Sequence, residues 1–274
     1  MCWRSTASST RRIRLGPERI AYGIKALVLW WDKSAVSAVT AATCRRYVKE
    51  RGVKAATARR ELGVLSAALR YCVVEGYLSS APQVWLPAKG PPRDRWLTRS
   101  DVAKLLREAC KSPRARLHLP LYILISVYTG AQRDAILSLQ WQPNTAGGWV
   151  DLKHGVIDFR RPKETNKRRS IIPIPSRLKI FLRQARQRTR QYVLEFEGQP
   201  IGDPKKALGT AGQRAGLSHV YSHLLRHTAV TWLVQAGVPL WEVAGWVGMS
   251  VEMIERVYGH HSPDRFAAVM KAQR

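Results

Sequence analysis

The amino-acid sequence predicts an α+β protein, mainly α-helical with a small β-sheet, built from two domains. Through most of the 274 residues, apolar side chains recur at every third or fourth position, as one buried face of a helix requires. Two short β-branched runs flank a basic stretch in the second half, which is typical of a hairpin or small sheet. A segment rich in Pro and basic residues interrupts the periodicity near residue 90, which predicts a linker between two helical regions.

Residues 1–86 are predicted to form a helical domain. Its first helix repeats apolar residues at a spacing of three and four: Ile20, Ile24, Leu27, Val28 and Trp31. A short helix is expected from Thr40 to Lys49, closed near Gly52. A longer one is expected from Lys54 to Glu75, with Gly76 just past its end. We expect these helices to share one core.

Residues 87–96 are predicted to be the linker, and residues 97–274 the second domain. The run Thr98-Arg-Ser-Asp101 has the form of a capping box, which predicts a helix through Ala109. The stretch from Leu119 to Tyr128 is apolar on nearly all sides and predicts a buried helix.

The rest of the second domain is expected to contain the sheet and further helices. Strands are predicted at Val156–Phe159 and Arg169–Ile174. An amphipathic helix is predicted over Ser176–Arg190, with one buried side made of Leu178, Phe181, Leu182 and Ala185. From Pro204 onward the pattern is helical again, punctuated by Gly216, Gly237 and Gly248.

The charge of the chain predicts a polyanionic partner. Forty-six Lys and Arg stand against nineteen Asp and Glu, for a net charge of +27, and binding to nucleic acid releases counterions from such a partner. No apolar run reaches the roughly 18 residues that a membrane span needs, so no membrane association is expected. The residues predicted to follow a phosphate backbone are Lys54, Arg59, Arg60, Arg160, Arg161, Arg168 and Arg169.

Four short motifs in the second domain carry the chemistry. They are Tyr128-Thr-Gly-Ala-Gln-Arg-Asp-Ala-Ile-Leu-Ser-Leu-Gln-Trp141, the basic hairpin at 160–169, His223-Leu-Leu-Arg226-His227, and Val257-Tyr258-Gly-His-His261. The pair His223 and His227 has the spacing of two zinc ligands on a helix. No Glu follows His223 and no third ligand is suitably spaced, so no metal is predicted.

In order and spacing, these motifs resemble the catalytic domain of the tyrosine recombinases (phage integrases). That resemblance implies a helical core-binding (SAM-like) domain before the linker and the recombinase catalytic domain after it. It implies that Tyr258 is the nucleophile, that Arg226 clamps the scissile phosphate and that His223 assists proton transfer. A hairpin lysine, Lys167 or alternatively Lys163, is implied to protonate the leaving 5′-oxygen. The reaction needs neither a metal nor another cofactor.

The chain departs from the family pattern at two positions. Gln132 occupies the slot of the first family arginine, and Arg133 follows one residue late, a rotation of about 100° on a helix. We expect Arg133 to take over the role. Met249 occupies the slot of a second His or Trp and cannot donate a strong hydrogen bond. His260 or His261 are candidates for that contact, and a packed Met with two surface histidines is the alternative.

The sequence therefore predicts a site-specific DNA recombinase of a phage or other mobile element, acting on double-stranded attachment sites as a homo-tetramer. Its expected location is the cytoplasm of a bacterial host, associated with the nucleoid. Two alternatives stay open: a DNA-binding protein of the same fold with catalysis weakened by Gln132, and an activity like that of a type IB topoisomerase.

Overall fold

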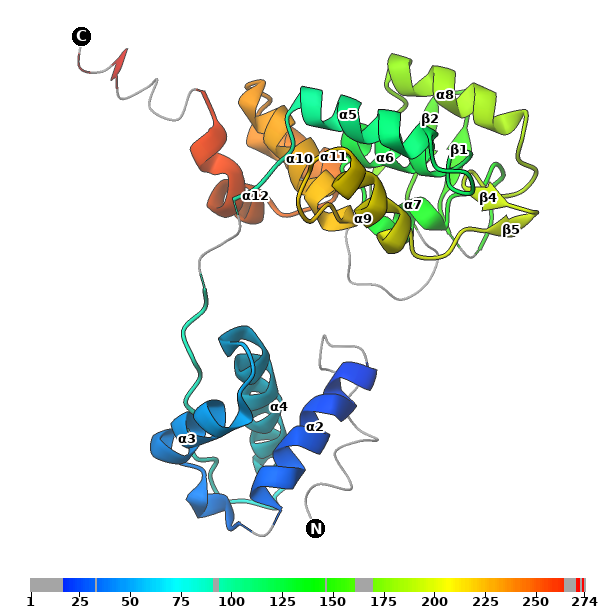
Figure 1. Cartoon of the computed structure of the whole chain (residues 1–274). Helices are drawn as coiled ribbons and strands as arrows, with labels where there is room; N and C mark the ends of the chain where they lie inside the picture. The colour runs from blue at the N-terminus through cyan, green and yellow to red at the C-terminus, as the bar shows by residue number, and fades with distance from the viewer. Residues whose placement is uncertain are drawn as a thin grey trace. The chain divides into compact units, whose positions relative to one another are not determined.

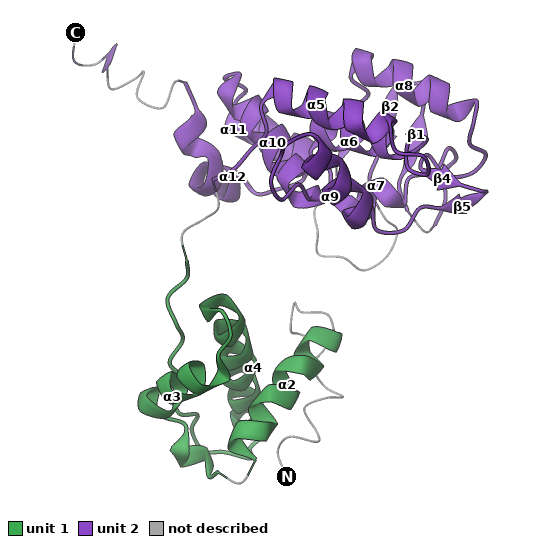
Figure 2. Ribbon diagram, viewed as in Figure 1, with its two compact units in different colours: residues 1–92 green, residues 93–274 purple. Residues whose placement is uncertain are grey.

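The chain forms two compact units, residues 1–92 and 93–274, each with its own hydrophobic core (Figures 1 and 2). The coordinates are a computed structural model, which describes residues 17–32, 34–90, 94–145, 147–160, 170–263, 270–271 and 273. Among the described helices, none combines the length and the hydropathy that a membrane span requires.

Unit 1 is entirely helical in its described part. Its elements are α2 (Pro17–Trp31), the short 3-10 helix η1 (Val36–Ala38), α3 (Ala41–Arg51) and α4 (Ala55–Val74). Helix α3 begins at a capping box between Thr40 and Thr43, and it ends at Gly52 in the left-handed conformation. Helix α2 packs along α4, because both place their apolar stripe toward the shared core.

The described part of unit 2 is built around one buried helix. Helix α6 (Leu119–Thr129) is buried on nearly all sides, and it packs against other helices on several of them. The helices of the unit are α5 (Arg99–Cys110), α6, α7 (Arg133–Leu137), α8 (Ser176–Arg186), α9 (Lys205–Arg214), α10 (Ser222–Gln235), α11 (Leu240–Val247) and α12 (Val251–Tyr258), followed by the 3-10 turn η2 (Gly259–His261).

A three-stranded antiparallel sheet adjoins this helical layer. Its strands β1 (Trp149–Asp151), β2 (Val156–Asp158) and β3 (Ile171–Pro173) lie in that order. The central residues Val150, Ile157 and Ile172 are paired across the sheet and buried. A second small hairpin joins β4 (Glu195–Phe196) to β5 (Gln199–Pro200).

The structure confirms the predicted fold class, a mainly helical chain with a small sheet. The capping box at Thr98 and Asp101 is present, and the predicted buried helix and the two predicted strands are found within a few residues of their expected ends. The helix predicted to run to Arg190 ends at Arg186. Phe181 was predicted on the buried side of this helix, but it is exposed. The buried face of α8 is narrow and consists of Leu178 and Leu182, and Phe181 lies beside it.

Candidate functional site

Among the described residues of unit 2, Arg226 is the most deeply buried charged residue. It lies in α10 between the buried residues Leu225 and Thr228, and only 7% of Arg226 is exposed. Its Nη1 donates a hydrogen bond to the carbonyl oxygen of Gly130. Among the described ion pairs, none joins Arg226 to a carboxylate. A buried cation without a counter-ion is costly, so the guanidinium is ready to accept an anion.

Gly130 holds this arrangement together. It closes α6 in the left-handed conformation, with φ at 62°, which glycine adopts without strain. A Cβ at this position would lie 2.9 Å from Cγ1 of Val247 and 3.4 Å from Cβ of Ala229. The end of α6 is therefore in close contact with both α10 and α11, and it orients its carbonyl toward Arg226.

A hollow of about 610 Å³ opens in front of Arg226. Four of the side chains around it are basic or can become so: Arg133, Lys205, His223 and Arg226. The remaining lining residues are Gln132, Asp203, Tyr221, Ser222, Gly248, Met249, Ser250 and Met253. Because basic groups converge on it from α7, α9 and α10, the hollow is suited to a phosphate or another anion.

The start of α7 brings Gln132 and Arg133 to the rim of this hollow. Gln132 is the residue before the helix, and its side chain forms no capping hydrogen bond. Arg133 is partly exposed, and two carboxylates hold its guanidinium. Nε lies 2.9 Å from Oδ1 of Asp134, and Nη1 lies 2.7 Å from Oδ2 of Asp203. Arg133 thus lines the hollow, but its charge is already compensated by two carboxylates.

Tyr258, the expected nucleophile, is buried beside α10. It is the last residue of α12, and only 3% of it is exposed. Its hydroxyl lies 2.7 Å from Nδ1 of His227, and the ring of His227 is 4.5 Å from that of His223. The phenol therefore contacts the residue that follows Arg226 in α10. Tyr258 itself is not among the residues that line the hollow.

The electrostatics around this tyrosine favour neutral groups. Burial raises the pKa of Tyr258 to about 12, and the charge of Arg226 opposes that rise. Burial, together with the neighbouring His223 and Arg226, lowers the pKa of His227 to about 4, and Asp94 acts against this. Desolvation and Arg226 also lower the pKa of His223. A neutral His227 can accept the hydrogen bond of the phenol.

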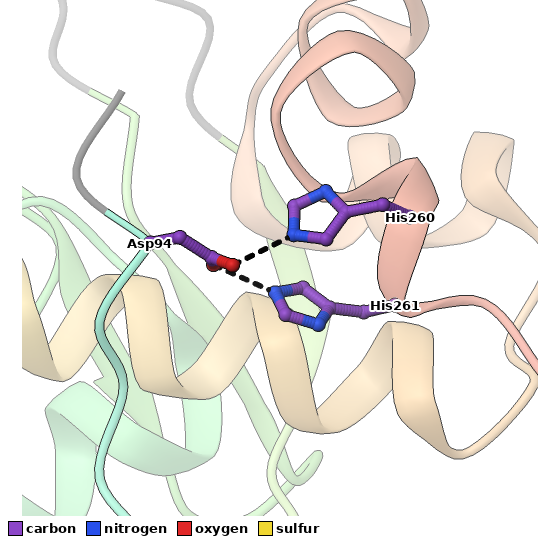
Figure 3. Close-up of side chains that lie close together, drawn as sticks. All are labelled: Asp94, His260 and His261. Atoms are coloured by element: carbon purple, nitrogen blue, oxygen red, sulfur yellow. Dashed lines mark hydrogen bonds and ion pairs between the residues drawn. The ribbon is translucent and has the colours of Figure 1, made fainter. Parts of the chain in front are cut away.

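His260 lies outside the hollow. Its Nε2 is 3.0 Å from Oδ2 of Asp94, and Nε2 of His261 is 2.9 Å from Oδ1 of the same carboxylate (Figure 3). Both imidazoles come from η2, directly after Tyr258, whereas Asp94 precedes α5. Met249 does line the hollow, so neither histidine replaces it there in this arrangement.

The basic hairpin lies largely outside the described residues. This applies to Arg161, Lys163, Lys167, Arg168 and Arg169, whereas Arg160 is described and pairs with Asp158 at 2.8 Å. The two residues that flank the hairpin, Phe159 and Ser170, line a small cavity together with Gln132 and Arg226. The base of the hairpin is thus next to the buried arginine.

The basic residues predicted in unit 1 differ in their contacts. Lys54 and Arg60 are exposed, and Lys54 precedes α4 directly. Arg59 is partly buried and donates a hydrogen bond to the carbonyl oxygen of Pro87. Arg59 therefore has a structural contact within unit 1 in addition to any role on DNA.

Several lining residues of the hollow were not predicted from the sequence. Asp203 accepts a hydrogen bond from the backbone N–H of Lys205 at 3.1 Å, next to the start of α9. The run Asp203-Pro204 is a recognisable helix start. Its pairing with Arg133, 70 residues away, has no local signal. His227, whose ring contacts the phenol, was part of the quoted motif and of the rejected zinc pair, but it was given no role.

Comparison with known proteins places these features in a family. A sequence model of the "Phage integrase family" matches residues 95–265. The integrase of Salmonella phage P22 is 28% identical over 235 residues, which cover 79% of this chain and 57% of that protein. A "Tyrosine recombinase XerC-like" protein of Caldanaerobacter subterraneus subsp. tengcongensis is 25% identical over 277 residues, 83% of this chain and 69% of that protein.

The fold is also that of solved members of the family. A lambda integrase tetramer bound to a Holliday junction superposes with a TM-score of 0.71 at 20% identity, covering 96% of this chain and 77% of that one. At this identity the likeness shows the fold. This chain spans little more than half the length of the phage P22 integrase.

Proposed function

Because the chain belongs to the phage integrase family, we propose that it is a site-specific DNA recombinase that cuts and rejoins double-stranded DNA through a phosphotyrosine bond at Tyr258. The observation that carries this proposal is the position of Arg226. It is a buried guanidinium with no carboxylate partner among the described residues, it lines the hollow of about 610 Å³, and it lies next in sequence to His227, whose imidazole contacts the Tyr258 phenol.

The proposed reaction is a transfer of one phosphodiester bond. The phenol of Tyr258 gives its proton to the imidazole of His223 as its oxygen attacks phosphorus. A Tyr–O–P bond forms, and the bond from phosphorus to the 5′-oxygen breaks. Lys167, or alternatively Lys163, gives its proton to the leaving 5′-oxygen. Attack by a 5′-hydroxyl reverses these steps and reseals the strand, so no external energy source is needed.

Arg226 stabilises the negative charge that spreads over the non-bridging oxygens. A planar guanidinium donates two parallel hydrogen bonds, and its fixed position avoids reorganisation during the reaction. His223 lines the same hollow, and its lowered pKa keeps it neutral near pH 7, as a proton-transfer group requires.

The phenol of Tyr258 must move for this chemistry. In the present arrangement it is hydrogen-bonded to His227 and covered by the core of α10, α11 and α12. A change at the end of α12 that turns the phenol toward Arg226 is therefore part of the proposal. Consistent with this, α12 is only eight residues long and ends at the short turn η2.

DNA is the proposed partner, with a homo-tetramer as the assembly. Support comes from the net charge of +27 and from the lambda integrase tetramer on its junction, whose fold this chain shares. Arg133, Lys54, Arg60, Arg160 and the basic residues of the hairpin are proposed to contact phosphates, with Arg133 in the role of the missing family arginine.

A covalent trapping experiment tests the function. A DNA duplex nicked near the cleavage point loses the short 5′-hydroxyl fragment, so that the phosphotyrosine link accumulates. We expect a protein–DNA adduct with the wild-type chain and none with Tyr258→Phe, while both proteins bind the DNA equally. Adduct formation by Tyr258→Phe would overturn the assignment of the nucleophile.

A second function is favoured by one specific observation, the Gln132 side chain beside an Arg133 whose charge two carboxylates already compensate. A chain with this defect binds DNA but cuts it poorly. The same experiment separates the two functions. No adduct with wild type, together with an adduct from Gln132→Arg, identifies a DNA-binding protein that has lost cleavage.

A further inference from the structure

Three side chains from distant parts of unit 2 converge on one point beside the end of α12. Asp94 lies in the segment before α5, and His260 and His261 lie in η2 (Figure 3). The Nε2 atoms of the two imidazoles lie 3.0 Å and 2.9 Å from the two oxygens of the Asp94 carboxylate. One nitrogen or oxygen atom from each of the three residues lies within 4.8 Å of the others.

Packing already holds the two imidazoles in place. The side chain of His261 is only 8% exposed, and its ring contacts the ring of Trp96 edge to face at 4.7 Å. The ring of His260 lies 3.9 Å from that of His261 and stays partly open to solvent, as does Asp94. The fold thus orients the three groups and leaves the site accessible from outside.

This set of groups has the composition of a transition-metal site. Neutral imidazole nitrogen and a carboxylate oxygen are the usual ligands of zinc, at about 2.0–2.2 Å from the ion, which places tetrahedral ligand atoms roughly 3.3–3.5 Å apart. Each Nε2 lies 2.9–3.0 Å from a different oxygen of the Asp94 carboxylate, and one ligand atom from each of the three residues lies within 4.8 Å of the other two. Three protein ligands leave a fourth position for water.

We propose that Asp94, His260 and His261 bind one divalent transition-metal ion of the zinc class. The ion takes the place of the Nε2 protons that the two imidazoles otherwise direct at the carboxylate. It joins the segment entering α5 to the turn that follows Tyr258 directly, and so restrains the chain at the end of α12. Asp94 is 166 residues from His260, so sequence spacing alone gives no sign of this site.

Titration with metal salts tests the proposal on the full chain, freed of any polyhistidine tag and of metal by chelation. Cobalt(II) chloride reports on coordination through its visible absorption, and zinc chloride then competes for the same site. We expect one ion per chain. Asp94→Asn and His260→Gln should each weaken binding by at least about 100-fold, since the loss of even an outer-shell partner costs about 10–100-fold.

Two control variants distinguish this site from the other histidines. His154→Gln removes a histidine that pairs with a single carboxylate, Asp151, at 2.6 Å, and it should leave the affinity unchanged. His223→Gln removes one of the two adjacent imidazoles on α10 and should also have no effect. Thermal melting shows that each variant is folded, and His260 is exposed enough to be replaced without loss of the core.

The outcomes are decisive in both directions. Absence of one-to-one cobalt binding overturns the proposal, as does binding that survives both Asp94→Asn and His260→Gln. Binding that disappears with His223→Gln places the ion on α10 and also overturns it. Slower amide exchange of residues 259–262 in the presence of zinc, abolished by Asp94→Asn, supports the restraint at the end of α12. None of these measurements depends on recombination.

Discussion

Arg226 and Arg133 line the same hollow, but they are held in opposite ways. Arg226 is buried and bonded only to the carbonyl of Gly130 among the described contacts, whereas Arg133 is partly exposed and paired with Asp134 and Asp203. A buried guanidinium without a carboxylate keeps its full charge for an anion, and an exposed one between two carboxylates does not. Arg226 can therefore bind a phosphate directly, whereas Arg133 can do so only after its ion pairs with Asp134 and Asp203 break.

The largest effect on the rate of adduct formation is expected from replacing Arg226. Arg226→Lys should slow adduct formation on the nicked duplex by about 10³-fold, because Lys cannot reproduce two parallel hydrogen bonds to a phosphate. The measurement is the single-turnover rate at saturating protein. Arg214→Lys, an exposed change in the last turn of α9, should keep the wild-type rate. A rate within tenfold of wild type for Arg226→Lys would show that the buried arginine is not the main phosphate ligand.

A smaller effect, an increase in the rate of adduct formation, is expected from replacing Gln132. Gln132→Arg restores an arginine at the position of the family residue, and we expect adduct formation to rise by about 10²-fold, within the range that a transition-state arginine supplies. The matched control is Gln187→Arg, which adds the same charge at the exposed end of α8. Equal rates for the two variants would mean that net charge, and not position, limits cleavage.

The smallest effect concerns stability and comes from the pH dependence of His227. Its pKa in the folded chain is about 4, because of burial and the charges of His223 and Arg226, against which only Asp94 acts; Tyr258 is its hydrogen-bond partner. The unfolded chain binds this proton already near pH 6.5. Folding stability is therefore fully present above pH 6.5 and is lost as the pH falls toward 4.

We expect this loss to be of the order of 1–2 kcal/mol, after reduction for the partial exposure of the ring. Urea unfolding at pH 7 and pH 4 measures it, with His227→Gln as the variant that should lose correspondingly less between the two pH values. His219→Gln, an exposed change, should keep the wild-type difference. The same pH dependence in His227→Gln as in wild type would contradict the lowered pKa.

Local patterns explain which parts of the fold were predictable. The capping box of α5, the periodicity of α4 and the continuous apolar run of α6 are each local signals, and the structure confirms these helices. Strands β2 and β3 stand out in the sequence by their β-branched runs, whereas β1, β4 and β5, with two or three residues each, lack such a run and are defined by their partners. Phe181 was placed inside because periodicity gives the centre of a buried stripe more reliably than its edge.

The site was predictable to the extent that its residues stand in short motifs. Arg226 and His223 were found because they share one turn of α10, and both line the hollow. The roles assigned to them stay predictions. The ion pair of Arg133 with Asp203 and the contact of Tyr258 with His227 join residues 70 and 31 positions apart. Such contacts arise from tertiary packing, for which a single sequence carries no local signal.

Gly130, at the end of α6, limits which substitutions this protein can accept. Its carbonyl fixes Arg226, and the space where a side chain would stand is filled by Val247 and Ala229. Any larger residue at position 130 displaces helix packing and the anion-binding group in one step. Mutational libraries should therefore tolerate no exchange at this position, even when selected for folding alone, whereas Gln132, two residues further on, stays free to vary.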